Sequence, residues 1–331
     1  MPPTLLPMLA GGVGMPRDPT AWLYEPKWDG IRAMVTVSAH NLTVANRRGG
    51  DVTAGYPEMA PMAAALAGHA AVLDGEVVTF DGEGRPSFQR LQRRMHVRNP
   101  PARLVAEVPV AFVAFDLLWL DGELLVGQPQ AQRRRLLEAL DLRGPAWSTT
   151  PLLADAPDRD TLDACRAAGL EGYMAKRRDA PYQPGRRSPA WSKIKCVRRR
   201  EFVVGGWSPG QAGRTGSIGS LALGAYDVSP EDAAAAGRPA RLGYVGLAGS
   251  GLSEELIGVL TTAFARIGRP DSPFAGPVDP GLRFVEPLLV ADVAYTEVTE
   301  SGTLRQPSLK GLRADVDPRR VLADGAKRVE T

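Results

Sequence analysis

The apolar pattern of this chain changes character near residue 197, and that change constrains the fold more than any other feature. Before residue 197, strand-like runs are mixed with amphipathic, helix-like runs. The strand-like runs are 22–26, 31–38, 71–80 and 108–120, and the helix-like runs are 57–68, 87–95, 129–140 and 158–169. Long βαβ alternation is missing, which argues against a doubly wound parallel sheet. We therefore expect an α+β domain over residues 1–197.

After residue 197 the strand-like runs are short, and they follow a basic connector, KIKCVRRREF (193–202). They span 201–207, 220–227 and 240–247, and an amphipathic helix with Ser253 as its N-cap is expected at 253–268. A further strand-like stretch covers 283–300. Five short strands with one helix after the third form the order of an OB-fold β-barrel, a common nucleic-acid-binding module. We expect this domain over 198–331, with 229–239 as a polar hairpin loop.

Length and composition exclude several classes of protein. The chain has 331 residues, which suits two domains, and no apolar run is long enough to span a membrane. The apolar start is broken by prolines and lacks a basic leader, so we expect no signal peptide. Cys165 and Cys196 cannot build a disulfide framework or a four-cysteine zinc site, and the three histidines are far apart. A cytoplasmic protein without structural zinc is expected.

Lysine is scarce in this chain, and that scarcity draws attention to Lys27 in EPKWDGIR (25–32). Of the 40 basic residues, 34 are arginine and six are lysine. A lysine amine can lose its proton and attack an electrophile, which a guanidinium cannot do. Two interpretations of Lys27 follow, a solvated side chain at the end of a strand or a nucleophile.

An ordered series of motifs favours the nucleophile. Downstream of Lys27 lie NRRGGD (46–51), LDGEVV (73–78), FVAFDLLWLDG (112–122), EGYMAKR (171–177), WSKIK (191–195) and TLRQPSLKGLR (303–313). The series resembles the covalent nucleotidyltransferases, the superfamily of polynucleotide ligases and mRNA capping enzymes. It is most similar to bacterial ATP-dependent DNA ligases of the stand-alone C type and to the ligase module of the D type. The resemblance covers nearly the whole chain.

The resemblance implies a fold and a reaction. The first domain would be a nucleotidyltransferase, or adenylation, domain of antiparallel sheets with flanking helices. Lys27 would attack ATP to form lysyl-AMP, AMP would pass to the 5′-phosphate of nicked double-stranded DNA, and a 3′-hydroxyl would then seal the nick. A phosphoramidate on lysine splits one hard transfer into easier steps. A free lysine has a pKa of about 10.4, and neighbouring cations favour the neutral amine. Lys193 and Lys195 alternate along a strand and would supply that charge.

The resemblance also assigns residues to the nucleotide. Glu25 would contact the adenine amino group, and Phe115 would stack on adenine, although a core phenylalanine is the alternative for Phe115. Arg32 and Arg47 would hold the ribose and the phosphates of the adenylate and the nick, for which a forked guanidinium is suited. Asp29 would shape the turn after Lys27 and take part in joining the strands.

Two glutamates are candidate ligands for Mg²⁺ or Mn²⁺, because such ions bind phosphates together with one or two carboxylates. Glu76 would contact the ribose or the metal, and Glu171 would hold metal near the α-phosphate. The alternative for either one is an ion pair with an arginine. In the last motif, Arg305 and Lys310 would bind ATP phosphates, although Gln306 departs from the usual wording of the family.

Contact with DNA is expected from dispersed arginines, because clustered cations bind phosphates without sequence preference. The candidates are Arg90, Arg94, Arg177, Arg198, Arg199 and Arg200. The arginines at 133–135 are assigned to the surface of a helix.

Other functions remain open from the sequence. An RNA ligase or a capping-type guanylyltransferase shares the lysine chemistry, and an OB-type DNA-binding protein with an inactive transferase domain is a third possibility. An NAD-dependent ligase is disfavoured, because those enzymes carry a further N-terminal module and a cysteine zinc site. We expect a monomer that acts in DNA repair, with repair proteins as unidentified partners and no membrane association.

Overall fold

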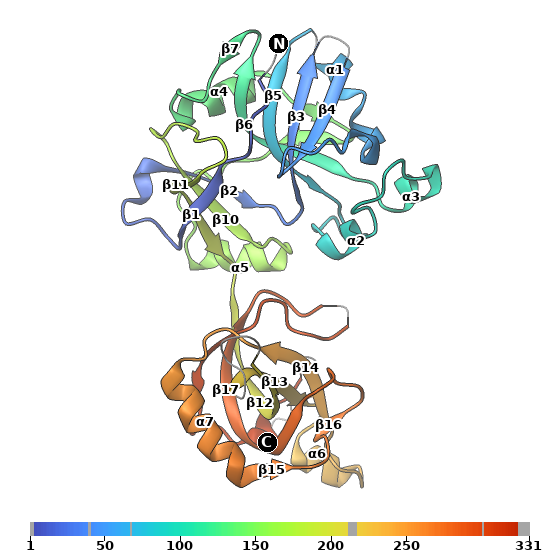
Figure 1. Cartoon of the computed structure of the whole chain (residues 1–331), viewed down its shortest axis with the longest axis vertical. Helices are drawn as coiled ribbons and strands as arrows, with labels where there is room; N and C mark the ends of the chain where they lie inside the picture. Colours follow the sequence, from blue (N-terminus) through green and yellow to red (C-terminus); the bar gives the residue numbers. More distant parts are fainter. Residues whose placement is uncertain (1–2, 39–40, 67, 211–216, 300, 324–331) are drawn as a thin grey trace. The chain divides into compact units, whose positions relative to one another are not determined.

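The computed structural model describes residues 3–38, 41–66, 68–210, 217–299 and 301–323. Two compact units divide the chain, Met1–Cys196 and Val197–Thr331 (Figure 1). The boundary lies one residue before the one expected from the sequence. None of the helices among the described residues is both long enough and apolar enough to cross a bilayer.

A seven-stranded sheet forms the larger part of the first unit. Its strands run in the order β4-β3-β5-β6-β9-β8, with β7 paired to β6. All neighbours are antiparallel except β6 and β9. The strands are β3 (Ile31–Ser38), β4 (Asn41–Asn46), β5 (Ala71–Val78), β6 (Ala111–Leu120), β7 (Glu123–Leu124), β8 (Arg143–Gly144) and β9 (Trp147–Thr149). The strands predicted at 31–38, 71–80 and 108–120 are confirmed.

A second, four-stranded sheet brings three of the sequence motifs together. Its order is β1 (Leu9–Val13), β11 (Arg187–Lys195), β10 (Gly172–Arg177) and β2 (Trp22–Lys27). In the central strand β10, Gly172 lies opposite Lys27 on one side and opposite Lys195 on the other. The end of this sheet therefore places EPKWDGIR, EGYMAKR and WSKIK next to one another.

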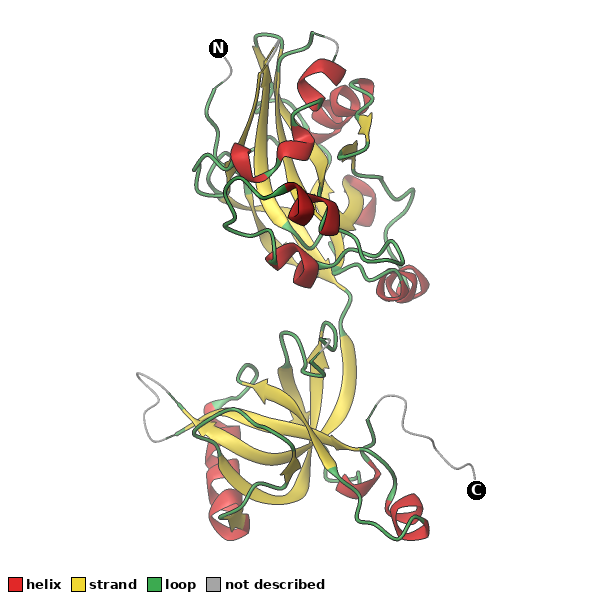
Figure 2. Cartoon of the chain, turned by 90° about the vertical axis from the view of Figure 1, so that its right-hand side faces the viewer, coloured by secondary structure: helices red, strands yellow, loops and turns green. Residues whose placement is uncertain are grey.

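Helices lie outside the sheets of the first unit (Figure 2). They are α1 (Met62–Ala65), α2 (Phe88–Gln92), α3 (Ala102–Glu107), α4 (Gln130–Ala139) and α5 (Arg159–Ala167), with 3-10 turns at Pro19–Ala21, Thr53–Gly55 and Pro57–Met59. The helix predicted at 57–68 is reduced to one 3-10 turn and the short α1. Pro61, which lies between the turn and α1, explains the break, because proline lacks the N–H that a continuous helix requires.

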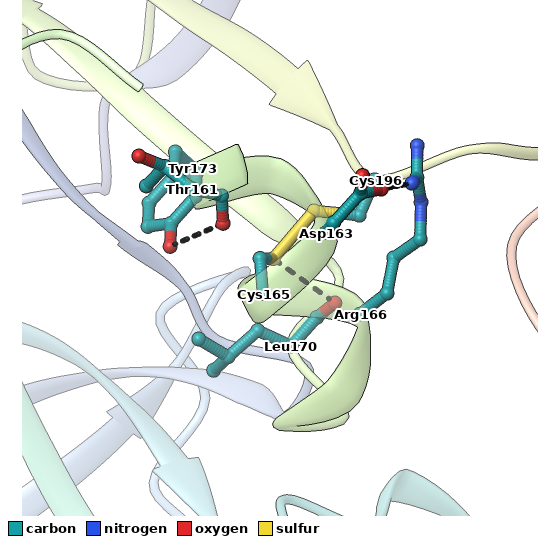
Figure 3. The surroundings of a disulfide bond; sticks show 7 residues. All are labelled: Thr161, Asp163, Cys165, Arg166, Leu170, Tyr173 and Cys196. Atoms are coloured by element: carbon teal, nitrogen blue, oxygen red, sulfur yellow. Dashed lines mark hydrogen bonds and ion pairs between the residues drawn. A yellow bond between two sulfur atoms is a disulfide. The ribbon is translucent and has the colours of Figure 1, made fainter. Parts of the chain in front are cut away.

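A disulfide joins Cys165 on α5 to Cys196, the residue after β11 (Figure 3). Both residues are buried in a small cluster that contains Tyr173. The Tyr173 hydroxyl donates a hydrogen bond to the Thr161 carbonyl at 3.4 Å. These contacts anchor α5 to the sheet that carries Lys27.

The second unit is a curled seven-stranded sheet around its own core. Its order is β15-β17-β12-β13-β14-β16, with β18 paired to β17. The strands are β12 (Arg198–Pro209), β13 (Ile218–Tyr226), β14 (Leu242–Ala248), β15 (Gly268–Arg269), β16 (Phe274–Ala275), β17 (Arg283–Tyr295) and β18 (Ser308–Leu312). The helices are α6 (Pro230–Ala235) and α7 (Glu254–Ile267), with a 3-10 turn at Pro318–Arg320. The OB-type order, with α7 after the third long strand, is confirmed.

The expected barrel does not close into a continuous ladder. The segment after β14 meets β18 only through an isolated parallel bridge between Ser250 and Ser308. The predicted cap of α7 is confirmed, since the Ser253 side chain accepts a hydrogen bond from the Leu256 N–H. The loop predicted at 229–239 is wrong in part, because it contains α6. Ser229 caps that helix and Pro230 follows as its first residue, a usual helix start.

Candidate active site

A cavity of about 230 Å³ lies in the first unit and collects most of the residues assigned to the nucleotide. Both sheets contribute to its wall. It is lined by Leu9, Ala10, Glu25, Pro26, Lys27, Trp28, Arg32, Arg47, Glu76, Phe115, Met174, Lys176, Arg187, Trp191 and Lys193. The motifs of the first unit thus converge on one cavity, although its lining residues are spread over more than 160 residues of the chain.

Lys27 is held at this site by a carboxylate. Its ammonium forms an ion pair with Glu171, and the Lys195 Nζ lies 3.4 Å from the other oxygen of the same carboxylate. Burial raises the pKa of Glu171, but the charges of Lys27 and Lys195 outweigh it and the net pKa lies below its usual value. Burial and the charge of Lys27 lower the pKa of Lys193. The site therefore combines one ionised carboxylate with three clustered amines.

The turn that follows Lys27 requires a glycine. A Cβ on Gly30 would lie 2.2 Å from the Val77 carbonyl oxygen, so no larger residue fits. Asp29 lies in this turn, and the Trp28 indole N–H donates a hydrogen bond to the Thr150 hydroxyl at 2.9 Å. These contacts fix the backbone of the turn that follows Lys27, from Trp28 to Gly30.

Arg32 is fixed in the wall of the cavity. Its guanidinium donates two hydrogen bonds of 2.6 Å to the fully buried Asp74, which also accepts from the Tyr182 hydroxyl at 2.5 Å. The guanidinium carbon lies 4.6 Å from the centre of the Phe115 ring. The sequence does not reveal the roles of Asp74 and Tyr182, because neither residue is chemically unusual on its own.

Glu76 lies next to Arg32 across the strands β5 and β3. Burial raises the pKa of Glu76 to about 7, against the opposing charges of Arg32 and Lys27. A further positive charge bound beside Glu76 would favour its ionised form.

Lys176 is a site residue that the sequence did not reveal, although it is one of the six lysines. It is 1% exposed, its Nζ lies 2.5 Å from a Glu25 carboxylate oxygen, and it donates to the Phe115 carbonyl at 2.9 Å. Its Nζ also lies 4.3 Å from the Phe115 ring centre and 4.4 Å from that of Trp191. Burial raises the pKa of Glu25 and lowers that of Lys176. The pair forms a polar wall beside an aromatic one.

The assignment of Arg94 to DNA binding is wrong. Arg94 is 1% exposed, pairs with both oxygens of Glu58 at 2.7 and 3.1 Å, and donates to two backbone carbonyls. Arg94 is therefore not placed to contact a phosphate, and it joins the segment after α2 to the 3-10 turn at Pro57–Met59.

The other candidate arginines stay predictions. Arg90 donates to the Glu107 carbonyl, Arg177 pairs with Asp179, and Arg199 pairs with Asp292. Arg198 is exposed on β12, and the Arg200 side chain donates to the Leu322 carbonyl.

The arginines at 133–135 do not all lie on the surface. Arg133 is fully buried and pairs with Asp116 on β6 at 2.8 and 2.9 Å, and Arg134 is 5% exposed. Only Arg135 of the three is exposed. The charge of Arg133 could not be predicted to lie inside, because its partner stands 17 residues away in an apolar strand.

Arg47, Arg305 and Lys310 complete the assigned set. Arg47 is exposed at the rim of the cavity. In the second unit, Arg305 pairs with Glu297 at 2.7 Å, and Lys310 on β18 donates to the Ser308 hydroxyl at 3.2 Å.

A divalent ion would fit this site only in company with phosphate. Across the described residues, no three His, Cys, Asp or Glu side chains are grouped as metal ligands. Glu171 and Glu76 offer hard oxygen donors, and an ion such as Mg²⁺ commonly binds one or two carboxylates plus substrate phosphates.

Comparison with known proteins gives the family. The family described as "ATP dependent DNA ligase domain" matches residues 7–195, and "ATP dependent DNA ligase C terminal region" matches residues 214–316. The multifunctional non-homologous end joining DNA repair protein LigD of Mycobacterium tuberculosis is 38% identical over 325 residues, 97% of this chain and 40% of that protein. DNA ligase C1 of Mycolicibacterium smegmatis is 34% identical over 232 residues, 68% of this chain and 65% of that protein.

Solved structures agree. The crystal structure of the ligase domain from M. tuberculosis LigD is 37% identical, covers 97% of this chain and 98% of that one, and gives a TM-score of 0.54. A structure of mycobacterial DNA ligase D complexed with ATP and MES is also 37% identical, over 96% and 98%, with a TM-score of 0.53. The chain spans about 40% of the length of the LigD relatives. It belongs to the ATP-dependent DNA ligase family.

Proposed function

We propose that this chain seals nicks in double-stranded DNA with ATP, through an AMP-lysine intermediate on Lys27. The observation that carries the proposal is the cavity in which Lys27, Lys193 and the aromatic wall meet, with Glu171 paired to Lys27. The matches to ligase families over both units support the same reaction.

In the first step, the Lys27 amine attacks the α-phosphorus of ATP and pyrophosphate leaves. Lys27 must first release Glu171, because the amine can attack only when its nitrogen lone pair is free. A divalent cation held by Glu171 and Glu76 would neutralise charge on the phosphates. The protein's remaining task is to position the reacting groups, as in other phosphoryl transfers.

The base of ATP would lie against Phe115, with its amino group toward Glu25. Both residues line the cavity, and Lys176 holds them together. Arg32, Arg47 and Arg187 offer cations along the wall toward Lys27. In the later steps, Asp29 and these arginines would act on the adenylated 5′-phosphate and the 3′-hydroxyl.

The second unit would bind DNA and assist the ATP step. The arginines at 198–200 would contact DNA phosphates without sequence preference, and so would Arg90 and Arg177 of the first unit. Arg305 and Lys310 would stabilise the leaving pyrophosphate. We further propose that the chain acts as a monomer in DNA repair, and the LigD relatives favour end joining.

The test of this function is a sealing assay on a nicked duplex that carries a labelled 5′-phosphate. With ATP and Mg²⁺ the two strands should become one, and with GTP in place of ATP they should not. Sealing rates on nicks that carry a ribonucleotide at the 3′-hydroxyl side or at the 5′-phosphate side would show whether the enzyme prefers DNA or RNA at each side. Efficient sealing with GTP, or none with either nucleotide, would overturn the proposal.

A further inference from the structure

Arg134 on α4 lies behind the wall of the cavity and is not among the residues that line it. Its Nη2 donates to the Thr150 carbonyl at 2.6 Å, and its Nε donates to Glu138 at 2.8 Å. Its Nη1 is buried, has no hydrogen-bond partner within the described chain, and lies 3.9 Å from an oxygen of Glu25. The Nη1 group of the buried Arg134 guanidinium therefore faces Glu25 and donates no hydrogen bond to another group of the described chain.

Glu25 needs such a neighbour, because it is only 3% exposed. One of its oxygens, Oε1, lies 2.5 Å from the Lys176 Nζ, and the other, Oε2, faces Arg134. A buried carboxylate without adequate positive charge takes up a proton instead of staying ionised. The ionised and the protonated carboxyl differ in what they offer a purine base, since the first only accepts hydrogen bonds and the second can also donate one.

We propose that Arg134 is a positioning residue for base selection: its free arm keeps Glu25 ionised and oriented, so that the site accepts a 6-amino purine and rejects a 6-oxo purine. This inference rests on the proposed function, in which Glu25 faces the base. An ionised Glu25 accepts from a 6-amino group and repels a 6-oxo group. A protonated Glu25 would donate to the 6-oxo group, and the discrimination would fall.

The charged groups that face Glu25 come from three elements. They are Lys176 on β10 and Arg134 on α4, which favour the ionised form, and Asp116 on β6, which opposes it. Burial raises the pKa of Glu25, and the charge of Lys176, followed by that of Arg134, acts against the increase. Loss of Arg134 would raise this pKa further, so base selection should weaken first at the acid end of the working pH range.

The experiment compares Arg134→Gln with Arg135→Gln, since Arg135 is the exposed neighbour on the same helix. Formation of the Lys27 adduct is measured with ATP and with ITP, whose base carries a 6-oxo group, at several pH values. Arg134→Gln should raise the KM for ATP by roughly tenfold, the scale of losing one charge-assisted contact, and should lower the ATP-to-ITP preference. The fall in the ATP-to-ITP preference should become larger as the pH decreases, whereas the rate of adduct formation at saturating ATP should change little. Arg135→Gln should match the unmodified enzyme.

A double-mutant comparison separates this role from a structural one. In a Glu25→Gln background, Arg134→Gln should have no further effect on the ATP-to-ITP preference, because no charge remains to be held. A wild-type KM and preference in Arg134→Gln, or an equal loss in both backgrounds, would overturn the inference.

If Arg134→Gln does not fold, Arg134→Lys carries the test. It keeps the charge but loses the planar fork, so a smaller fall in the ATP-to-ITP preference is expected, and an unchanged preference would contradict the inference. The unmodified enzyme is the control for the proposed function itself. If it forms no adduct with ATP at Lys27, the function is wrong; if it does and Arg134 has no effect, only this inference is wrong.

Discussion

Lys27 and Glu171 form an ion pair although 144 residues separate them along the chain. The pairing of β2 with β10 produces this contact, because it sets Lys27 opposite Gly172, the residue after Glu171. Lys195 joins the same carboxylate from β11. Lys27, the Glu171 carboxylate and the Lys195 ammonium are thus brought together by three adjacent strands of one sheet.

Glu171→Gln should slow formation of the lysyl-AMP adduct by about 10²–10³, the usual effect of removing one preorganised charge. The variant loses both the partner of Lys27 and a donor for the divalent ion, so replacing Mg²⁺ by Mn²⁺ should recover part of the rate. Single-turnover labelling with ATP measures the effect. Glu83→Gln is the control, because Glu83 is an exposed carboxylate whose ion partner, Arg85, lies outside the cavity. Equal rates in the two variants would remove Glu171 from the mechanism.

Glu76 should make the free protein less stable as the pH rises. Burial raises its pKa from 4.5 to about 7, so the folded state holds a proton that the unfolded state releases. Its contribution to stability is present below pH 4.5 and is lost as the pH rises through about 7. The Glu76→Gln variant should not show this loss of stability, because glutamine does not titrate. The free energy of unfolding in urea, measured at pH 5 and at pH 7.5 without metal, should therefore fall more in the unmodified protein than in the variant. Parallel changes would contradict the assigned pKa.

Arg94→Ala should reduce the stability of the first unit and leave DNA binding intact. It would leave the partly buried Glu58 without its partner, and breaking a buried pair costs about 3–5 kcal/mol.

Arg198→Ala should weaken DNA binding and leave stability unchanged, because Arg198 is exposed on β12. It should lower the salt dependence of binding to nicked DNA by about one unit of slope. Thermal unfolding and salt titrations of binding distinguish the two, and exchanged outcomes would contradict both assignments.

Replacing Arg305 and Lys310 together by alanine should impair the ATP step more than the sealing step. The double variant should label itself poorly with ATP, yet it should seal a nick whose 5′-phosphate already carries AMP. The measurement is the rate of sealing the nick that already carries AMP, divided by the rate of sealing an ordinary nick with ATP. This ratio is compared with the same ratio for the unmodified enzyme. An unchanged ratio would mean that these cations do not act on ATP.

Much of the lining of the cavity could be predicted from the sequence, because the residues concerned lie in short motifs with their own chemical pattern. Lys27, Glu25, Glu76 and Lys193 each stand in such a motif, and the structure brings them to one cavity. The Ser-Pro-Glu-Asp sequence at 229–232 is itself a helix-start pattern, and it favours α6 over the predicted loop.

The supporting residues could not be predicted, because their roles depend on partners that are distant in sequence. Arg94 looks like a surface arginine until Glu58 is placed beside it, 36 residues away. Lys176 and Glu25 meet only through the pairing of β10 with β2. An arginine-rich chain hides its buried arginines among its exposed ones, and only the fold separates them.

The most direct measurement of the central claim is denaturing electrophoresis after incubation with α-labelled ATP and Mg²⁺. The unmodified protein should carry the label, and Lys27→Ala and Lys27→Arg should not, since arginine keeps the charge but cannot act as the nucleophile. Arg135→Gln, a substitution at an exposed position of α4 outside the cavity, should still be labelled. A labelled Lys27→Ala protein would contradict the account, because AMP would then be carried by another residue.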